Sequence, residues 1–270
     1  MLSSWHNALL RFIDPLDAVT AACTWVPPAG EGVCATCHAA APPGRERCFS
    51  CFRTAAQVSA PVADVVPISL YRTGDDLWYA LRHYKDGRDA AERRRLRRDL
   101  ARLLSRFLRS HVPCVAPGAA SSWHITAVPP TRRRARLPAR RRPVEGLIRR
   151  SRWLRRRYVR TLRTLRAPAH RQASDNAFAV TTDVGGLDLL LVDDTYTTGA
   201  SVQSAAAALR LAGARVLAVV VIGRVVNPGA NPAEARLWAA ARRRPFRLQE
   251  CCRDARHAPD FAAFPLPWSP

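Results

Sequence analysis

The chain has 270 residues, 48% of them hydrophobic, and 43 Lys and Arg against 21 Asp and Glu give a formal net charge of +22. This length and apolar fraction suffice for one α/β domain plus a smaller unit, and they exclude a chain that is disordered throughout. No run of eighteen apolar residues is present and the N-terminus lacks a basic-then-apolar signal, so we expect no membrane span and a cytoplasmic location.

Arginine supplies nearly all of the positive charge, and Lys85 is the only lysine. A basic surface attracts nucleic acid, phosphorylated metabolites or acidic lipid headgroups. Charge runs are also common on solvated faces, where arginine needs no ligand at all. Composition leaves both interpretations open.

The sequence divides into three parts: residues 1–60 with a cysteine module, residues 61–226 with strand and helix patterns, and an extension, 227–270, that is mostly irregular. The module contains two CxxC pairs separated by ten residues, Cys34, Cys37, Cys48 and Cys51. Such pairs suit tetrahedral zinc in a structural role. Disulfides and a CxxC redox centre are the alternatives, and the expected cytoplasmic location favours reduced thiols.

The other four cysteines, Cys23, Cys114, Cys251 and Cys252, lack paired spacing. We expect each to be a buried, unreactive thiol. His38 is adjacent to the module but surplus to a four-cysteine site. His111, like the other isolated histidines, has no partner at readable spacing, which is typical of a structural side chain.

Hydrophobic periodicity predicts the elements of the middle part. In chain order we expect a strand at 64–70, a helix at 75–84 capped by Asp75, a basic amphipathic helix at 90–109, a loop at 111–122, a strand at 123–128, an arginine-rich loop at 131–142, a helical stretch at 144–165 and a short strand at 178–182. In the extension, residues 233–243 favour a helix.

The most sharply patterned unit spans residues 187–224 and reads strand, loop, helix, strand. The apolar run 187–192 is typical of a strand buried on both faces. It ends in Asp193 and Asp194, after which a hydroxyl-rich turn leads into a helix from 202 to 212, closed by Gly213. This is a βαβ unit, whose ligand position lies at the carboxyl end of the first strand.

The turn has the chemistry of a phosphate site, because a helix N-terminus offers unpaired N–H groups and a positive dipole end. Hydroxyls there add donors without adding charge, from Thr195, Thr197, Thr198 and Ser201. Two carboxylates alone would repel phosphate, so they indicate a ligand that also presents diol hydroxyls, such as ribose 5-phosphate. The plainer alternative is that the two acids end a strand and Ser201 caps a helix.

The stretch LLLVDDTYTTGAS resembles the ribose-phosphate signature of the type I phosphoribosyltransferases. The wider layout is similar to the ComF family of competence-associated phosphoribosyltransferase-like proteins: a four-cysteine module, a helix ending in LRHYKDG, a strand ending in VPP, and then the signature. The resemblance covers residues 34–224. It implies a type I phosphoribosyltransferase-like α/β fold, a parallel sheet flanked by helices, with a small N-terminal zinc-binding module.

The resemblance also implies a ligand, phosphoribosyl pyrophosphate, accompanied by Mg²⁺. Asp193 and Asp194 would hold the ribose hydroxyls, and Lys85 would be a phosphate ligand or catalytic cation. Thr131 and Arg132 would lie near the pyrophosphate. The 5-phosphate would be held by the loop residues Thr195, Thr197, Thr198, Gly199, Ala200 and Ser201.

Three functions follow as expectations. The first is transfer of ribose 5-phosphate to an unidentified acceptor, although many relatives carry an acid where Thr197 stands, and threonine cannot replace it as a general base. The second is a DNA-uptake protein that reuses the fold, with arginines of 93–109 and 132–160 contacting single-stranded DNA or another nucleic acid. The third is a regulator that senses phosphoribosyl pyrophosphate.

Overall fold

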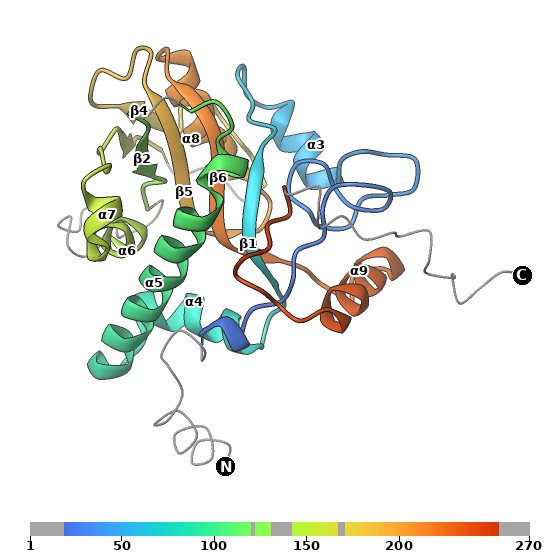
Figure 1. Ribbon diagram of the computed structural model, residues 1–270. Helices are drawn as coiled ribbons and strands as arrows, with labels where there is room; N and C mark the ends of the chain where they lie inside the picture. Colours follow the sequence, from blue (N-terminus) through green and yellow to red (C-terminus); the bar gives the residue numbers. More distant parts are fainter. Residues whose placement is uncertain (1–18, 120–121, 131–141, 167–170, 254–270) are drawn as a thin grey trace, which may run out of the picture.

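The computed structural model describes residues 19–119, 122–130, 142–166 and 171–253. It is a mixed α/β fold built on a parallel sheet of four strands in the order β1-β6-β5-β2 (Figure 1). The strands of this sheet are β1 (Val65–Tyr71), β2 (His124–Ala127), β5 (Asp188–Tyr196) and β6 (Arg215–Val225). A separate antiparallel pair joins β3 (Leu162–Thr164) to β4 (Phe178–Val180).

Helices flank the sheet. Their bounds are α3 (Phe49–Ala55), α4 (Asp76–Asp86), α5 (Ala90–Val115), α6 (Pro143–Arg150), α7 (Arg152–Arg155), α8 (Ala200–Leu211) and α9 (Pro232–Arg243). Asp75 caps α4 as predicted, since its carboxylate accepts a hydrogen bond from the Trp78 N–H at 2.8 Å.

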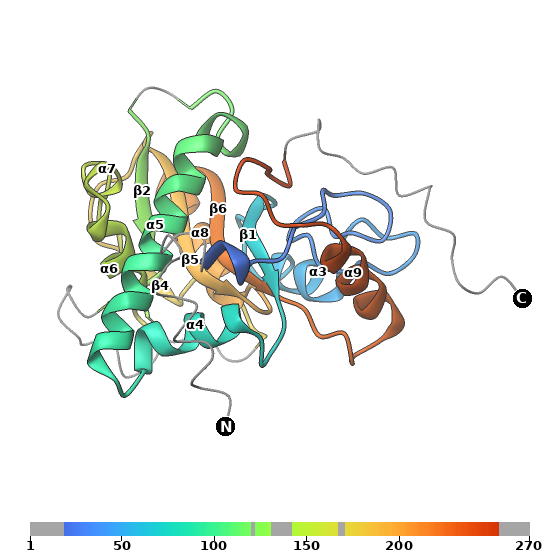
Figure 2. The ribbon, with the colours of Figure 1, turned by 60° about the horizontal axis from the view of Figure 1, so that its bottom comes forward.

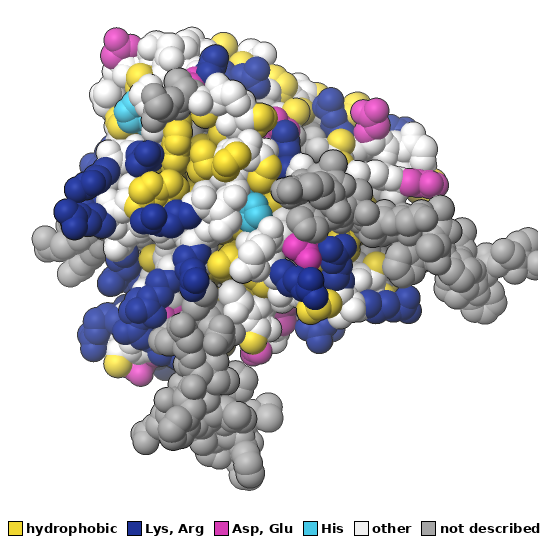
Figure 3. Space-filling view, in the orientation of Figure 1, with side chains coloured by type: hydrophobic (Ala, Val, Ile, Leu, Met, Phe, Trp, Pro, Cys, Tyr) yellow, Lys and Arg dark blue, Asp and Glu magenta, His cyan; other side chains and the backbone are white. Residues whose placement is uncertain are grey.

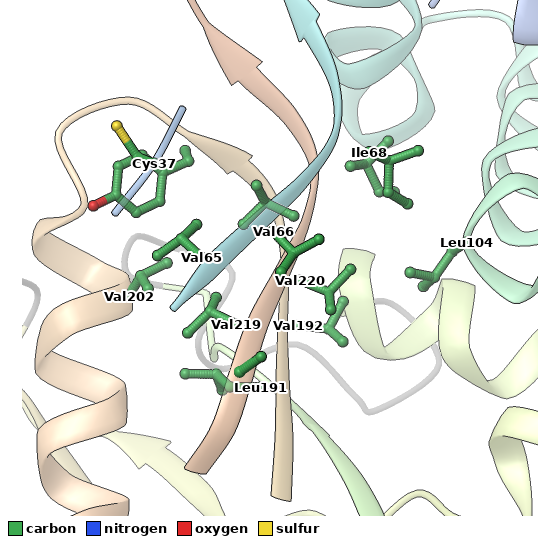
Figure 4. Packing of buried hydrophobic residues seen from close by; sticks show 14 of the residues in the cluster. Cys37, Val65, Val66, Ile68, Leu104, Leu191, Val192, Val202, Val219 and Val220 are labelled. Carbon is green, nitrogen blue, oxygen red and sulfur yellow. The ribbon is translucent and has the colours of Figure 1, made fainter. Parts of the chain in front are cut away.

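The core has two apolar layers, one on each face of the sheet. Figure 4 shows Val65 on the face toward Val202 of α8, while Ile68 and Val220 lie on the face toward Leu104 of α5. Successive strand residues alternate between faces, so a strand covered on both sides must be apolar at nearly every position. This requirement explains the apolar runs in β5 and β6 and the mostly apolar β1, whose central residues are buried.

Described segments from before and after the central part of the chain lie beside β1 (Figure 1). In Figures 1 and 2, α3 and α9 lie on the same side of the sheet, next to β1. Thr24 forms an isolated antiparallel bridge with Leu70, which partly covers the outer edge of β1. Pro67 interrupts β1, and this edge position tolerates a residue without an N–H. One continuous cluster of buried residues runs from Val19 to Cys252.

Two predicted helices differ most from the structure. The basic helix does not end at 109 but runs to Val115, with Pro113 in its last turn. Pro113 removes one N–H, yet His111 and Val115 are buried in this turn, and His111 bonds to the Leu248 carbonyl at 2.8 Å. Tertiary packing has therefore outweighed the helix-breaking tendency of proline.

The stretch 144–165 is also not one helix. It breaks at Ser151, whose hydroxyl accepts from the Leu154 N–H at 3.4 Å and starts the short helix α7. After α7 the chain is extended and pairs with β2, because Ile125 exchanges backbone hydrogen bonds with Arg157 and Val159. This pairing satisfies backbone N–H and C=O groups of β2, which would have stayed unpaired at the sheet edge if the helix had been longer.

Candidate functional site

A cleft of about 930 Å³ opens at the carboxyl ends of the parallel strands. Its floor is the end of β5 and the start of α8, and its walls come from α4, α6 and the residues after β2. The connection from β1 to β2 crosses the face that carries α5, whereas α8 covers the opposite face (Figure 1). A ligand site is expected where parallel strands are connected over opposite faces of the sheet.

The predicted ligand residues meet in this cleft. Those that line it are Lys85, Asp193, Asp194, Thr195, Thr197, Thr198, Gly199, Ala200 and Ser201. Lys85 is brought there from α4, more than a hundred residues earlier in the chain. Thr131 and Arg132 lie outside the described residues.

The loop itself is tighter than the sequence suggested. β5 does not end at Val192 but continues through both acids to Tyr196, so only residues 197–199 connect strand and helix. Gly199, not Ser201, is the N-cap of α8, with φ +84°, and no side chain caps the helix. The first helix bond runs from the Gln203 N–H to the Gly199 carbonyl, so the N–H groups of residues 200–202 remain for a ligand at this edge of the cleft.

Asp194 is held by the protein. Its carboxylate lies 2.5 Å from the Lys85 ammonium and accepts a hydrogen bond from the Tyr84 hydroxyl, both through the same oxygen. The Thr195 hydroxyl donates to the other oxygen at 3.2 Å. Tyr84 is fully buried and Asp194 nearly so. Lys85 therefore neutralises one of the two acids, and Tyr84 is a site residue that sequence reasoning missed.

Asp193 faces a different environment because successive strand residues point to opposite faces of the sheet. Burial at the cleft floor, and then the neighbouring Asp194 carboxylate, raise the pKa of Asp193 to about 8. Lys85 and the Asp194 N–H, which donates to an Asp193 oxygen at 2.8 Å, act in the opposite direction. Near neutral pH the Asp193 carboxyl can thus both donate and accept, which suits ligand hydroxyls.

An ion pair forms the opposite wall of the cleft. Arg160 donates to both oxygens of Glu145 at 3.0 and 2.9 Å, and Arg149 donates to Glu145 at 2.9 Å. Glu145 is buried, and the cleft is also lined by Arg142 and Arg171. The sequence pattern did not single out Glu145 or Arg160, because they lie in a stretch where arginine is frequent and only the fold brings them opposite the loop.

The four-cysteine cluster, Cys34, Cys37, Cys48 and Cys51, is assembled as the CxxC spacing predicted. All four thiols are buried, and their sulfurs lie within 4.8 Å of one another. This donor set fits a tetrahedral ion such as Zn²⁺. The ring of His38 bonds instead to the Pro27 carbonyl at 2.9 Å, which leaves His38 outside the cluster as expected.

The cluster touches the ligand loop. The Tyr196 hydroxyl lies 3.3 Å from the Cys51 sulfur, and burial followed by the nearby cysteine charges keep the pKa of Tyr196 well above its ordinary value. Arg224 is buried and donates to the Cys37 sulfur at 3.3 Å and to the Tyr196 carbonyl at 3.2 Å. A Cβ at Gly199 would collide with the Tyr196 phenol. The cluster, Tyr196 and the helix cap thus form one packed unit.

Arginines gather on a second surface, away from the loop. Figure 3 shows Lys and Arg side chains concentrated on the side of the molecule that carries α5 to α7. The exposed arginines of α5 recur every three or four residues along one face of the helix: Arg94, Arg98, Arg102, Arg106 and Arg109. This row extends for roughly 22 Å, and the Arg109 guanidinium lies 4.8 Å from the Trp153 ring on α7.

Comparison with protein-family models, with curated proteins and with solved structures finds no match to this chain. Within the residues that the structure describes, no helix has the length and apolar character to cross a membrane. The indications of function come from the chemistry of the cleft and of the four-cysteine cluster.

Proposed function

We propose that the cleft binds phosphoribosyl pyrophosphate, as the resemblance to the ComF family and to type I phosphoribosyltransferases implies. The observation that supports this most directly is the combination at one edge of the sheet: an uncapped helix N-terminus, a ring of hydroxyls, and a carboxyl whose pKa is raised. A site for phosphate alone would not place two carboxylates beside the phosphate. A sugar phosphate requires donors for its phosphate and carboxyl groups for its hydroxyls, both within the length of one ligand.

Each group has a role in this proposal. The N–H groups of residues 200–202 and the hydroxyls of Thr197, Thr198 and Ser201 donate to the 5-phosphate. Asp193 binds the ribose hydroxyls. Asp194 holds the Lys85 ammonium at the cleft, where it attracts the pyrophosphate. Mg²⁺ would be carried with the pyrophosphate and would offset its charge.

Transfer would extend this binding role. The bond between C1 of the ribose and the pyrophosphate oxygen breaks, pyrophosphate leaves with the bonding electrons, and an acceptor atom forms a new bond to C1. The transition state carries positive charge on the ribose, which would favour the ionised form of Asp193 and be stabilised by it. Thr197 offers no base for the acceptor proton, so the acceptor must arrive deprotonated or lose its proton to another group.

The test is calorimetric titration of phosphoribosyl pyrophosphate with Mg²⁺ at moderate salt. Asp193→Asn is the informative variant, because Asp194 also holds Lys85 and its replacement would disturb the fold. A double variant, Glu31→Gln with Asp183→Asn, is the control, since both acids are exposed and neither lines the cleft. We expect saturable binding by the parent and the control, and a loss of at least tenfold in Asp193→Asn.

Pyrophosphate alone is titrated in parallel, because a chain of this charge binds polyphosphates weakly at any surface. Equal affinity for pyrophosphate and phosphoribosyl pyrophosphate would contradict the proposal. So would equal binding by Asp193→Asn and the parent.

The arginine row on α5 supports a second candidate, nucleic-acid binding. It presents regularly spaced guanidinium groups with an aromatic ring at one end, and none of its arginines lines the cleft that contains Asp193. Single-stranded DNA would be bound through phosphate contacts and stacking, with steep salt dependence. Replacing Arg98 and Arg102 by glutamine should weaken such binding and flatten its salt slope, while Asp193→Asn leaves it unchanged.

A further inference from the structure

A second group of metal-ligating side chains lies at the end of α5, outside the four-cysteine cluster. It comprises His111 and Cys114 from the last turns of the helix and Cys251 from the segment after α9. The ligand atoms of the three residues all lie within 4.8 Å of one another. His111 and Cys251 are buried and Cys114 is half-buried. The spacing of the residues did not indicate this group, because Cys251 lies 137 positions after Cys114.

The imidazole of His111 is oriented for coordination. Its Nε2 lies 2.8 Å from the Leu248 carbonyl oxygen, which can only accept, so Nε2 carries the proton. The lone pair is then on Nδ1, which faces the Cys114 sulfur at 3.6 Å. Phe107 packs against the ring with centroids 4.6 Å apart and limits its rotation. A backbone carbonyl that fixes the tautomer in this way is typical of metal-binding histidines.

We propose that His111, Cys114 and Cys251 bind a second thiophilic ion, Zn²⁺ in the simplest case. Two sulfurs and one imidazole form a donor set that Zn²⁺ accepts, leaving one position for water or another ligand. Binding releases the thiol protons, because the thiolate is the ligand form. With three protein ligands instead of four, this ion is bound more weakly than the ion in the four-cysteine cluster.

The ion would fix the end of the chain to the core. The described segment after α9, residues 244–253, contacts α5 through the bond from His111 to Leu248, and Arg253 pairs with Asp64 near the start of β1. An ion bound by both α5 and Cys251 would add a metal-mediated crosslink to these contacts. The segment 244–253 would then be held by metal, as the N-terminal module would be by an ion in the four-cysteine cluster.

A disulfide between Cys114 and Cys251 is the competing interpretation of the same geometry. It needs no imidazole, and it would leave the orientation of His111 without a function. The two interpretations differ in metal content and in the thiol count, so one set of measurements separates them.

The experiment measures bound metal in the full chain after loading with Zn²⁺ under reducing conditions and desalting. We expect two equivalents for the parent and one each for Cys251→Ser and His111→Gln. Cys51→Ser should lose the other equivalent. Cys23→Ser is the matched control, because Cys23 is a buried cysteine that belongs to neither group of metal-ligating side chains, and it should keep two.

Co²⁺ substitution provides a readout that does not depend on variants folding well. The second equivalent of Co²⁺ should give a weaker sulfur charge-transfer band than the first, since two thiolates bind it instead of four. A parent protein that holds one equivalent would overturn the proposal. So would a second equivalent that persists in both Cys251→Ser and His111→Gln, or a Cys114–Cys251 disulfide in protein purified with reductant.

Discussion

Replacement of Gly199 by alanine tests how tightly the ligand loop depends on its neighbours. Gly199 has φ +84°, and an added Cβ would meet the Tyr196 phenol, which is itself packed against Cys51. The left-handed backbone should cost alanine about 1–2 kcal/mol. Displacing the buried phenol should add about 1–3 kcal/mol, as for other overpacked cores. We therefore expect Gly199→Ala to lower the free energy of unfolding by about 2–5 kcal/mol.

Gly186→Ala is the control for backbone strain alone. Gly186 has φ +71° with nothing within 4 Å of an added Cβ, so only the left-handed penalty applies. Both variants are unfolded in guanidinium chloride with zinc bound, and the midpoints and slopes are compared. Adding Tyr196→Phe to Gly199→Ala should recover part of the loss, because it removes the nearest atom. Equal destabilisation by the two alanine variants would refute the packing argument.

Three further predictions concern charged groups. The pKa of Asp193 is about 8 in the folded protein and about 3.9 in the unfolded chain. Between these values the native state binds one proton more than the unfolded state, so the free energy of unfolding falls by up to about 1.4 kcal/mol for each unit that the pH rises from 4 to 8. Asp193→Asn should therefore flatten the stability–pH curve in that window, and an unchanged slope would contradict the assignment. Tyr84→Phe should cost about 1.5–3 kcal/mol in thermal unfolding, because a buried carboxylate loses a donor. Arg224→Met should reduce zinc retention in a chelator competition about 10–100-fold, because Arg224 bonds to a cysteine of the cluster and the loss of such a group weakens metal binding. Zinc retention equal to that of the parent would show that Arg224 does not support the cluster.

The local patterns predicted much of the fold. The strands of the sheet, helix α4 with its Asp75 cap, and the strand–loop–helix around Asp193 all follow from periodicity and capping rules that act over a few residues. The four-cysteine cluster follows from CxxC spacing for the same reason, since both pairs and their loop lie within 18 residues.

The predictions failed where distant contacts decide the structure. Helix α5 continues past Pro113 because its last turn is buried and bonded to the segment after α9, and the chain after Arg155 leaves the helix to pair with β2. The link from Lys85 and Tyr84 to Asp194 has no local signature either, although a lone lysine in an arginine-rich chain was a usable signal. Contacts of this kind depend on topology, which a single sequence does not display.

The position of β1 has a consequence for how the chain is made. β1 is an edge strand whose ladder partner is β6, and its residues pair with positions roughly 150 later in the sequence, such as Val65 with Val219. At typical rates of synthesis, roughly 8–30 s separate the emergence of the two strands from the ribosome. Through that interval the apolar run VVPISLY has no partner in the sheet and offers a template for aggregation. All four cysteines of the cluster precede β1 in the chain, and the Val65 N–H donates to the carbonyl of Thr36, which lies between Cys34 and Cys37. A cluster that already held a metal would therefore give β1 an ordered neighbour before β6 is synthesised.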